Sequence, residues 1–547
     1  MSGVQGRRRD NLLFLAVLAI GVALRLHGIA FGLPALNDPD ELMFEMGATK
    51  MLTGGAMNPG WFGHPATTTM YVLALVNSAT FGVGWLLGSF STPTEYLQVI
   101  YKDPSIVILP GRLAIALFAM VTIWQVWRMG RDLGGPIAGL IAALLLASSP
   151  VHVTYSQIIR SDMMGTVFLL MTISAALRIA RDGKAADYRW AALALALAVS
   201  SKWPFAIAGA AVAGAVAVRL FERGRIARAD LRNFGAFLVL APILLVLISP
   251  YLVLDHQTVL RNLTGEARTQ HLGATGGGFL DNAWWYLSGP LLNGLGAIGL
   301  ALAGAGLVVM TRTRAIAWAV LPVLVAHILI ICLHGLRWER WVLPVLPLLA
   351  LAAGLAGAAG IRMAQARWPS GRAGVLAGAL MCTAPILLIP SAWTKAAART
   401  NDTRQAATRW AATHVPPGSV VMIEHFAFDV VSQPWTVIFP MGDAGCIDAK
   451  AMLDGKTDYR EIEAARGARS NVDYGTVARS RRATCRADYA ILMEMARYQD
   501  ERARFPAQAA AYDALLRDMK IEAIFRPEPD KRAGPVMIVL KAKSAPD

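Results

Sequence analysis

Charged residues are scarce in this 547-residue chain: only 16% are Asp, Glu, Lys or Arg, while 55% are hydrophobic and the mean hydropathy is +0.46. Soluble domains carry about 25% charged residues, so the composition excludes an ordinary soluble protein and indicates a membrane protein. The net charge of +15 does not indicate nucleic-acid binding. The basic residues lie in short clusters between apolar runs, as the positive-inside bias predicts.

Several enzyme motifs are also missing. The chain has no GxxxxGK[ST] phosphate loop, no GxSxG turn and no HExxH helix, which excludes a Walker-type nucleotide site and the usual serine-hydrolase and zinc-protease motifs. It has four cysteines, without the CxxC or Cys/His spacing of a structural zinc site. Cys446 and Cys485 lie in the polar C-terminal part, where a disulfide is allowed if that part faces an oxidising compartment.

Hydrophobic runs of about 20 residues, long enough to span a bilayer, recur along the first part of the chain. Arg7, Arg8 and Arg9 precede the first run, and other arginines lie between later runs, so we place these connections in the cytoplasm. No small-residue cleavage site follows the first run, which we therefore interpret as a retained span. The predicted spans are 12–33, 106–127, 136–157, 163–180, 188–201, 203–221, 233–253, 284–310, 315–334, 341–360 and 373–391.

Residues 66–90 leave the topology open. They are apolar enough to cross, but a crossing would invert every later span unless another crossing lies within 91–111. We therefore interpret 66–90 as a tilted, re-entrant or paired segment. The sequence predicts an α-helical membrane domain over residues 1–392, with about 11–13 transmembrane helices and an outward-facing loop at 34–65.

The composition changes after about Pro390, and residues 393–547 are charged enough to predict a soluble α/β domain outside the membrane. Two segments have helical patterns, three are β-branched and apolar as in strands, and residues 440–485 are predicted to be rich in loops. The predicted helices are 403–414 and 507–519, and the predicted strands are 419–424, 489–495 and 536–541.

An acidic cluster, Asn37-Asp38-Pro39-Asp40-Glu41, follows the first span and should emerge opposite the cytoplasm. One interpretation is local: Asp38 caps a helix, Pro39 takes its first position and Glu41 completes a capping box. Capping explains Asp40 less well. Carboxylates at a membrane surface are costly without a task, so the other interpretation makes Asp40 or Glu41 a general base fixed by the helix start.

Other charged residues are predicted on the same outer face. His64 precedes Pro65, where the chain would re-enter the membrane, and either anchors the interface or contacts a phosphate or metal. Asp162 begins a span and either caps it or provides a second carboxylate. Lys202, in a tight turn between spans, either snorkels or binds an anionic headgroup.

Two further segments complete the predicted site. Arg337 and Arg340 lie among tryptophans on the outer face, against the inside bias, which favours a phosphate-binding role; Glu339 could neutralise one of them. Residues 254–283 include Glu266, His271 and Gly276-Gly277-Gly278, and this polar, glycine-rich loop is typical of a mobile lid over a cavity.

These residues, in this order, resemble the GT-C glycosyltransferases, particularly the branch with the protein O-mannosyltransferases and the lipid A aminoarabinose transferases. The resemblance covers most of residues 10–360. It departs from the mannosyltransferases at Ala66, where they have a second proline, and from the aminoarabinose enzymes at His64, where they have lysine. The matching features are Asp40-Glu41, His64-Pro65, Arg112, the Gly-Arg-Asp-Leu-Gly-Gly stretch at 130–135, Ser149-Pro150 leading to Asp162, Lys202-Trp203-Pro204 and Arg340-Trp341-Val342-Leu343-Pro344.

The resemblance implies an enzyme of the bacterial inner membrane that transfers a sugar, with inversion, from a polyprenyl-phosphate donor to a lipid, polysaccharide or protein acceptor on the periplasmic face. The alternative is a transporter or flippase of a lipid-linked or anionic solute, although its site would lie near the bilayer midplane. The roles that the resemblance implies are Asp40 as base, Glu41 or Asp162 as acceptor-orienting group, Asp40 and Asp162 as optional ligands of Mg²⁺ or Mn²⁺, Lys202, Arg337, Arg340 and His64 as phosphate contacts, and Glu266 and His271 as acceptor or lid residues.

Overall fold

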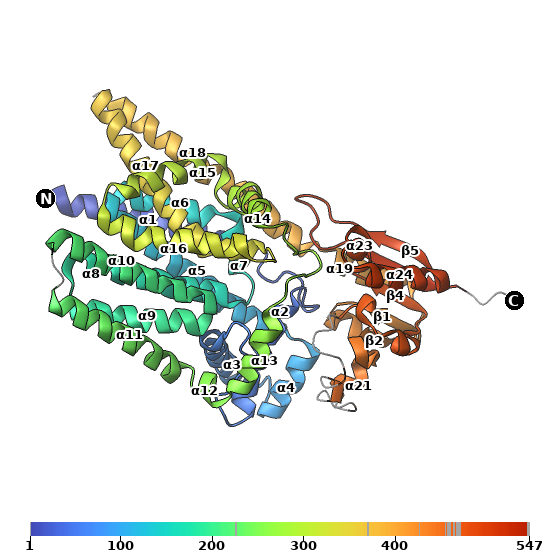
Figure 1. The fold of residues 1–547 in the computed structure, drawn as a ribbon. Helices are drawn as coiled ribbons and strands as arrows, with labels where there is room; N and C mark the ends of the chain where they lie inside the picture. Colours follow the sequence, from blue (N-terminus) through green and yellow to red (C-terminus); the bar gives the residue numbers. More distant parts are fainter. Residues whose placement is uncertain are drawn as a thin grey trace.

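The structure is a computed structural model that describes residues 2–224, 227–368, 371–425, 427–454, 456, 461–462, 465 and 472–543. Figure 1 shows a large helical part followed by a smaller C-terminal sheet domain, drawn in orange to red, at one side of it. The long helix α18 (Gly371–Thr400) leads directly into this domain. The fold is therefore the predicted one, a multi-span helical protein with a C-terminal α/β domain.

The helical part contains long helices joined by short ones. Those that precede α18 are α1 (Ser2–Leu26), α2 (Pro39–Thr53), α3 (Thr67–Leu86), α4 (Pro93–Lys102), α5 (Ser105–Gly134), α6 (Pro136–Ser148), α7 (Pro150–Ser156), α8 (Ser161–Asp182), α9 (Ala185–Ser201), α10 (Gly209–Arg223), α11 (Arg228–Ile248), α12 (Tyr251–Leu254), α13 (His256–Glu266), α14 (Phe279–Tyr286), α15 (Leu292–Thr311), α16 (Arg314–Leu333) and α17 (Val345–Arg367). Short 3₁₀ helices η1 (Trp203–Ala208) and η3 (Glu339–Val342) precede α10 and α17.

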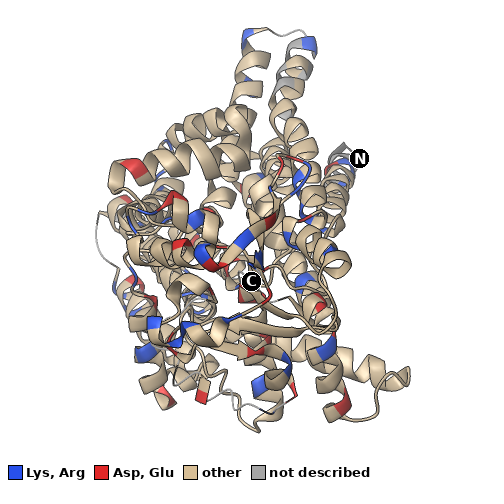
Figure 2. Ribbon diagram, turned by 90° about the vertical axis from the view of Figure 1, so that its right-hand side faces the viewer, with Lys and Arg blue, Asp and Glu red and all other residues tan. Residues whose placement is uncertain are grey.

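Among the described residues, eight helices are long and apolar enough to cross a membrane, or nine if the pair α6–α7, bent by 62°, forms one span. Helices lie over the spans predicted from the sequence, but those over 12–33, 188–201 and 373–391 are not among these candidates, so the count is below the predicted 11–13. Helix α3, whose crossing was left open, is one of the eight. In Figure 2 the projecting α17–α18 hairpin is uncharged along most of its length and carries basic residues at its tip. This is the pattern of a span that ends in a basic connection.

Glycine allows the helices of the membrane part to approach closely. A Cβ atom on Gly306 of α15 would lie 1.9 Å from the carbonyl oxygen of Ala352 in α17, and one on Gly214 of α10 would lie 1.8 Å from that of Trp318 in α16. Small residues permit such backbone contacts in membranes, where van der Waals packing replaces the hydrophobic effect as the force between helices. Helix α17 is the most enclosed candidate span, with 83% of its apolar window buried.

The C-terminal domain has a six-stranded sheet in the order β3-β2-β1-β4-β6-β5, in which β1 is parallel to β2 and β4. The predicted helices and strands are present as α19, α24, β1, β4 and β6, whereas β2, β3 and β5 were not predicted. The elements are α19 (Thr403–His414), β1 (Val420–Ile423), α20 (Phe428–Val431), β2 (Thr436–Pro440), β3 (Cys446–Asp448), α21 (Ala449–Leu453), β4 (Tyr489–Leu492), α23 (Met495–Asp500), α24 (Pro506–Asp518), β5 (Met519–Phe525) and β6 (Met537–Ala542).

A disulfide joins Cys446 at the start of β3 to Cys485, with their Cα atoms 5.0 Å apart. It ties the predicted loop-rich stretch back to the sheet. Such a bond is stable in an oxidising compartment, which agrees with the predicted outward position of this domain.

Candidate active site

The acidic cluster forms the start of α2. Asp38 caps the helix: its side chain accepts a hydrogen bond from the backbone N–H of Asp40 at 3.1 Å, and Pro39 lies in the first turn. The predicted cap is therefore confirmed. The predicted capping box is wrong, because both carboxylate oxygens of Glu41 have other partners.

Glu41 is fully buried and forms a two-pronged ion pair with Arg112 of α5. The Arg112 Nε and Nη2 atoms donate to its two oxygens at 2.8 and 2.7 Å, and the backbone N–H of Ile159 donates to one of them at 3.0 Å. Arg112 also donates to the carbonyls of Ile29 and Phe31. Glu41 thus fastens α2 to α5 and to the segment before α8, and has no exposed atom with which to orient an acceptor.

Arg160, just before α8, holds the other two carboxylates. Its guanidinium donates to both oxygens of Asp38 at 3.0 and 2.9 Å and to Asp40. The Asp40 side chain is 42% exposed, whereas that of Arg160 is 10% exposed. Burial raises the pKa of Asp40. The charges of Arg160 and Arg340 lower it by more than burial raises it, and the net pKa is about 2. Asp40 is therefore an ionised carboxylate that Arg160 holds on one side and that remains accessible on the other.

Asp162 and Lys202 form a second, buried ion pair that joins the start of α8 to the end of α9. His64 lies beside it: the charges of Lys202, Asp162, Arg340 and Asp40 all influence its pKa. Burial lowers that pKa to about 3, so the imidazole is neutral at neutral pH. The structure thus brings together five of the residues predicted from the sequence.

Arg340 differs from the other cations of this cluster. Its guanidinium lies 4.6 Å from the centre of the Trp338 ring, and its Nε atom is buried without a hydrogen-bond partner. Within the described part of the chain it forms no ion pair, whereas Arg112, Arg160 and Lys202 each have a carboxylate partner. Arg340 therefore has unused capacity for an anion.

The partners of Arg337 lie outside this cluster: it donates to Asp281 at 2.6 Å and stacks on Trp285. His271 lies edge-on to Trp338, with ring centres 4.9 Å apart, on the side of the cluster that holds Arg340. Glu266 ends α13 near Gly63; its Cγ would lie 3.2 Å from a Cβ atom there.

The segment predicted as a lid is more ordered than its glycine content indicated. It contains α12 and α13, and the side chains of Asp255 and Asn262 accept hydrogen bonds from Asn58 and from the backbone of Phe62. Its end pairs with the Arg337 segment through a bridge between Thr275 and Leu336.

The donor set does not fit the optional metal site. Asp40 and Asp162 each form an ion pair with a cationic side chain. Over the described residues, no three His, Cys, Asp or Glu side chains come together as ligands. No step is therefore derived through Mg²⁺ or Mn²⁺.

One residue of this site, Arg160, was not assigned a role from the sequence, and another, Glu339, has a different partner from the one expected. Arg160 stands two residues before Asp162, and this spacing to a candidate carboxylate was the available signal. Glu339 was expected to neutralise an arginine, but it accepts a hydrogen bond from Tyr155 at 3.3 Å. The pair links α7 to the segment that carries Arg340.

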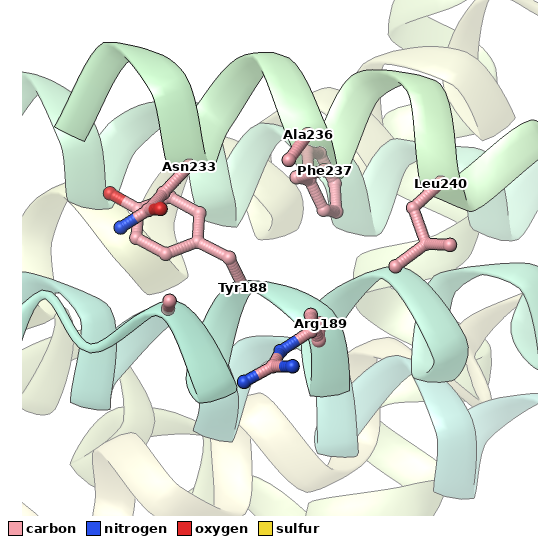
Figure 3. A pocket seen from close by; sticks show the side chains of 7 residues that line it. Tyr188, Arg189, Asn233, Ala236, Phe237 and Leu240 are labelled. Atoms are coloured by element: carbon pink, nitrogen blue, oxygen red, sulfur yellow. The ribbon is translucent and has the colours of Figure 1, made fainter. Parts of the chain in front are cut away.

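A cavity of about 290 Å³ lies elsewhere, between α9 and α11 (Figure 3). Its lining includes Tyr188 and Arg189 near the start of α9, the end opposite Lys202, together with Phe237 and Leu240 of α11. We do not associate it with the charged cluster, because it shares no residue with it.

Comparison with known proteins agrees with this architecture. The family described as dolichyl-phosphate-mannose-protein mannosyltransferase matches residues 105–254. No curated protein matches the sequence. The crystal structure of ArnT from Cupriavidus metallidurans in the apo state aligns over 99% of this chain and 98% of its own, with 13% identity and a TM-score of 0.53. The Archaeoglobus fulgidus oligosaccharyltransferase in complex with Zn and sulfate aligns over 94% and 72%, with 12% identity and a TM-score of 0.51.

The fold is therefore that of the GT-C glycosyltransferases, and the resemblance inferred from the sequence is confirmed at the level of the fold. The family match lies over α5 to α12 and includes Arg112, Arg160, Asp162 and Lys202.

Proposed function

We propose that this chain is a membrane glycosyltransferase that moves a sugar from a polyprenyl-phosphate donor to a hydroxyl-bearing acceptor on the periplasmic face of a bacterial inner membrane. The observation that carries this proposal is the pairing pattern of the charged cluster. One carboxylate, Asp40, is ionised and accessible, and one cation, Arg340, has no ion-pair partner among the described residues. A base and an anion site side by side are what transfer from a phosphate leaving group requires.

In the proposed step, the acceptor oxygen attacks the anomeric carbon from the face opposite the phosphate. The bond between that carbon and the phosphate oxygen breaks, its electron pair leaves with the lipid phosphate, and the acceptor proton passes to Asp40. Because there is a single displacement, the anomeric configuration inverts. A carboxylate held ionised by Arg160 is a weak base, so we infer that it takes the proton late, when the attacking oxygen has become strongly acidic.

The leaving phosphate gains negative charge as the bond breaks. Arg340 and Lys202 would stabilise it, and neutral His64 would donate one hydrogen bond. Asp162 would hold the Lys202 ammonium in place. Arg337 would act indirectly, because its pairing with Asp281 fixes the segment that carries Arg340.

The membrane location supports a lipid-linked donor. Nucleotide sugars are not available outside the cytoplasmic membrane, so a site on that face requires a donor delivered by the bilayer itself. The acceptor remains one of three classes, a lipid, a surface polysaccharide or a protein.

The test compares purified wild type with Asp40→Asn in lipid, using a panel of polyprenyl-phosphate sugars and an envelope extract as the acceptor source. Wild type should release free polyprenyl phosphate, and Asp40→Asn should lose about a hundredfold in rate, the scale of a missing general base. Asp182→Asn is the matched control, since it makes the same chemical change at the end of α8 opposite to Asp162, and it should keep the wild-type rate within about threefold.

Two results would contradict the proposal. Protein-dependent movement of the donor across the bilayer without release would favour the flippase. Equal release by wild type and Asp40→Asn would leave a transferase with a different base and return Asp40 to a structural role.

A further inference from the structure

The acidic cluster contacts the membrane part on one side and the C-terminal domain on the other. Asn37, the residue before the helix cap, is 6% exposed. Its side-chain amide forms reciprocal hydrogen bonds with that of Gln405 in α19, at 2.9 and 2.7 Å. Its backbone carbonyl accepts a hydrogen bond from Arg404 at 2.6 Å. These contacts join residues 367 and 368 positions apart in the chain, so the C-terminal domain reaches back to the first loop.

The contact on the domain side is built rigidly. Asp402 caps α19 and also binds the Arg404 guanidinium through two hydrogen bonds of 2.9 and 2.8 Å, which fixes the arginine that reaches Asn37. The next residue, Thr403, is bonded through its backbone and its hydroxyl to Ala533 and Pro535. The start of α19 is therefore fastened to the sheet domain before it contacts the membrane part.

On the membrane side of the contact, the backbone just before Asn37 is strained. Leu36 has a φ of +66°, a left-handed conformation that is unfavourable for a bulky residue. Strained residues persist where their surroundings hold them, commonly next to active sites. The bonds to Asn37 lie one residue after this strain and one residue before the Asp38 cap, so they determine the direction in which α2 begins.

We propose that the C-terminal domain is a positioning element of the site, in which Arg404 and Gln405 hold Asn37 and thereby the start of α2 that carries Asp40. This inference rests on the proposed function for its catalytic consequence. Neither Arg404 nor Gln405 touches the reacting groups; they act through Asn37. A base displaced by about 1 Å can lower a rate about a hundredfold, so the domain would control turnover without contacting the donor.

A second contact lies on the other side of the site. The backbone N–H of Gly273 donates to Glu501 at 2.7 Å, and Leu272 packs into the core of the C-terminal domain. Gly273 is two residues from His271, which lies against the Trp338 ring that supports Arg340. The domain thus contacts both the segment with the base and the segment next to the anion site.

The experiment uses the full-length protein in lipid nanodiscs and the variants Gln405→Leu and Asn37→Ala, which remove the amide pair from opposite sides. Hydrogen exchange of peptides covering residues 36–45 should become at least about threefold faster in both. The kcat for polyprenyl-phosphate release should fall about tenfold, as expected when a buried amide loses its partner, while the KM for the donor stays within about twofold. The swap Asn37→Gln with Gln405→Asn should restore both readouts, and Arg409→Ala, at an exposed site on α19, should change neither.

Unchanged exchange over residues 36–45 in both variants would overturn the proposal, as would faster exchange with an unchanged kcat. If Gln405→Leu also loosens the strands β1 and β4, Asn37→Ala decides the matter, because it leaves the C-terminal domain intact. If wild type releases no polyprenyl phosphate, the proposed function fails, and the exchange result alone decides whether the domain holds the start of α2.

Discussion

Replacement of Arg160 by methionine tests the electrostatic design of the site most directly. This one guanidinium binds Asp38 through two hydrogen bonds and Asp40 through a third contact. Without it, Asp40 loses the nearest of the charges that hold its pKa at about 2, while burial continues to raise that pKa. Burial and the remaining Arg340 charge then oppose each other, so the pKa of Asp40 should rise to about its ordinary value of 3.9, a change of about two units.

The consequence is a change in pH dependence. In wild type the base stays ionised above about pH 3, so kcat/KM should be flat on the acid side down to the pH at which the protein unfolds. In Arg160→Met the acid limb should move up by about two pH units, because a protonated Asp40 cannot accept a proton. The assay is release of polyprenyl phosphate between pH 4 and 8 in lipid.

The sign of the stability effect follows from the same shift. A carboxyl group whose pKa is lower in the folded state stabilises that state above its unfolded pKa, and this stabilisation is lost as the pH falls through the folded value. For Asp40 the window of loss lies between about pH 4 and 2, so the variant should unfold more readily at neutral pH. Arg160→Lys should move the acid limb back toward that of wild type.

Arg178→Met provides the control for this prediction. It removes an ion pair with Asp187 at the opposite end of α8 and should leave the pH profile unchanged. An unmoved acid limb in Arg160→Met, with or without a lower rate, would refute the reasoning. Either Arg160 does not set the ionisation of Asp40, or Asp40 is not the base.

Two further predictions concern the other ion pairs. Arg112→Met should lower the unfolding temperature strongly, since it leaves the buried Glu41 charge unpaired at a cost of about 3–5 kcal/mol. Adding Glu41→Leu should recover part of that loss. Equal unfolding temperatures for the single and double variants would contradict this prediction. Lys202→Met should raise the donor KM about tenfold to a hundredfold, the effect of one charge-assisted hydrogen bond of about 1.5–3 kcal/mol. Arg337→Met should change it by less than about threefold, because the partners of Arg337, Asp281 and Trp285, lie outside the charged cluster. The reverse order in a steady-state assay would contradict that assignment.

The membrane fold was predictable because the bilayer leaves few choices. Backbone groups in lipid must be hydrogen-bonded internally, so each long apolar run becomes a helix. The arginine clusters then indicate which connections face the cytoplasm. Residues 66–90 escaped this reasoning, since a helix such as α3 satisfies the same composition whether or not it completes a crossing.

The C-terminal domain was predictable only in its interior. The strands β1, β4 and β6 are apolar and largely buried, and their sequence pattern indicates this. The strand β3 has three residues, and β5 is an edge strand with several exposed positions. Short and edge strands take much of their stability from the neighbour with which they pair, which a sequence window does not contain.

The charged cluster was partly predictable, because charge near a membrane is costly and therefore informative. This rule singled out Asp40, Asp162, Lys202 and Arg340. It could not say which cation pairs with which carboxylate. Arg160 was overlooked because an arginine at the end of a span resembles an ordinary flanking residue.

The four ion-pair carboxylates and four cations of the site balance before any substrate arrives, with His64 neutral. A bound donor, as a phosphodiester, adds one negative charge. Transfer gives the phosphate a second negative charge and gives Asp40 a proton, so the total charge inside the site is the same before and after the reaction. The residues are Asp38, Asp40, Glu41 and Asp162, with Arg112, Arg160, Lys202 and Arg340.

This constant charge has a consequence for turnover under the proposed function. The charge changes only when Asp40 gives its proton to water, and the neighbouring Arg160 cation favours that release. The site then holds one negative charge more than it did with the donor, and repulsion favours departure of the lipid phosphate. Arg160 would thus act after the chemical step, as the group that couples loss of the proton to release of the product.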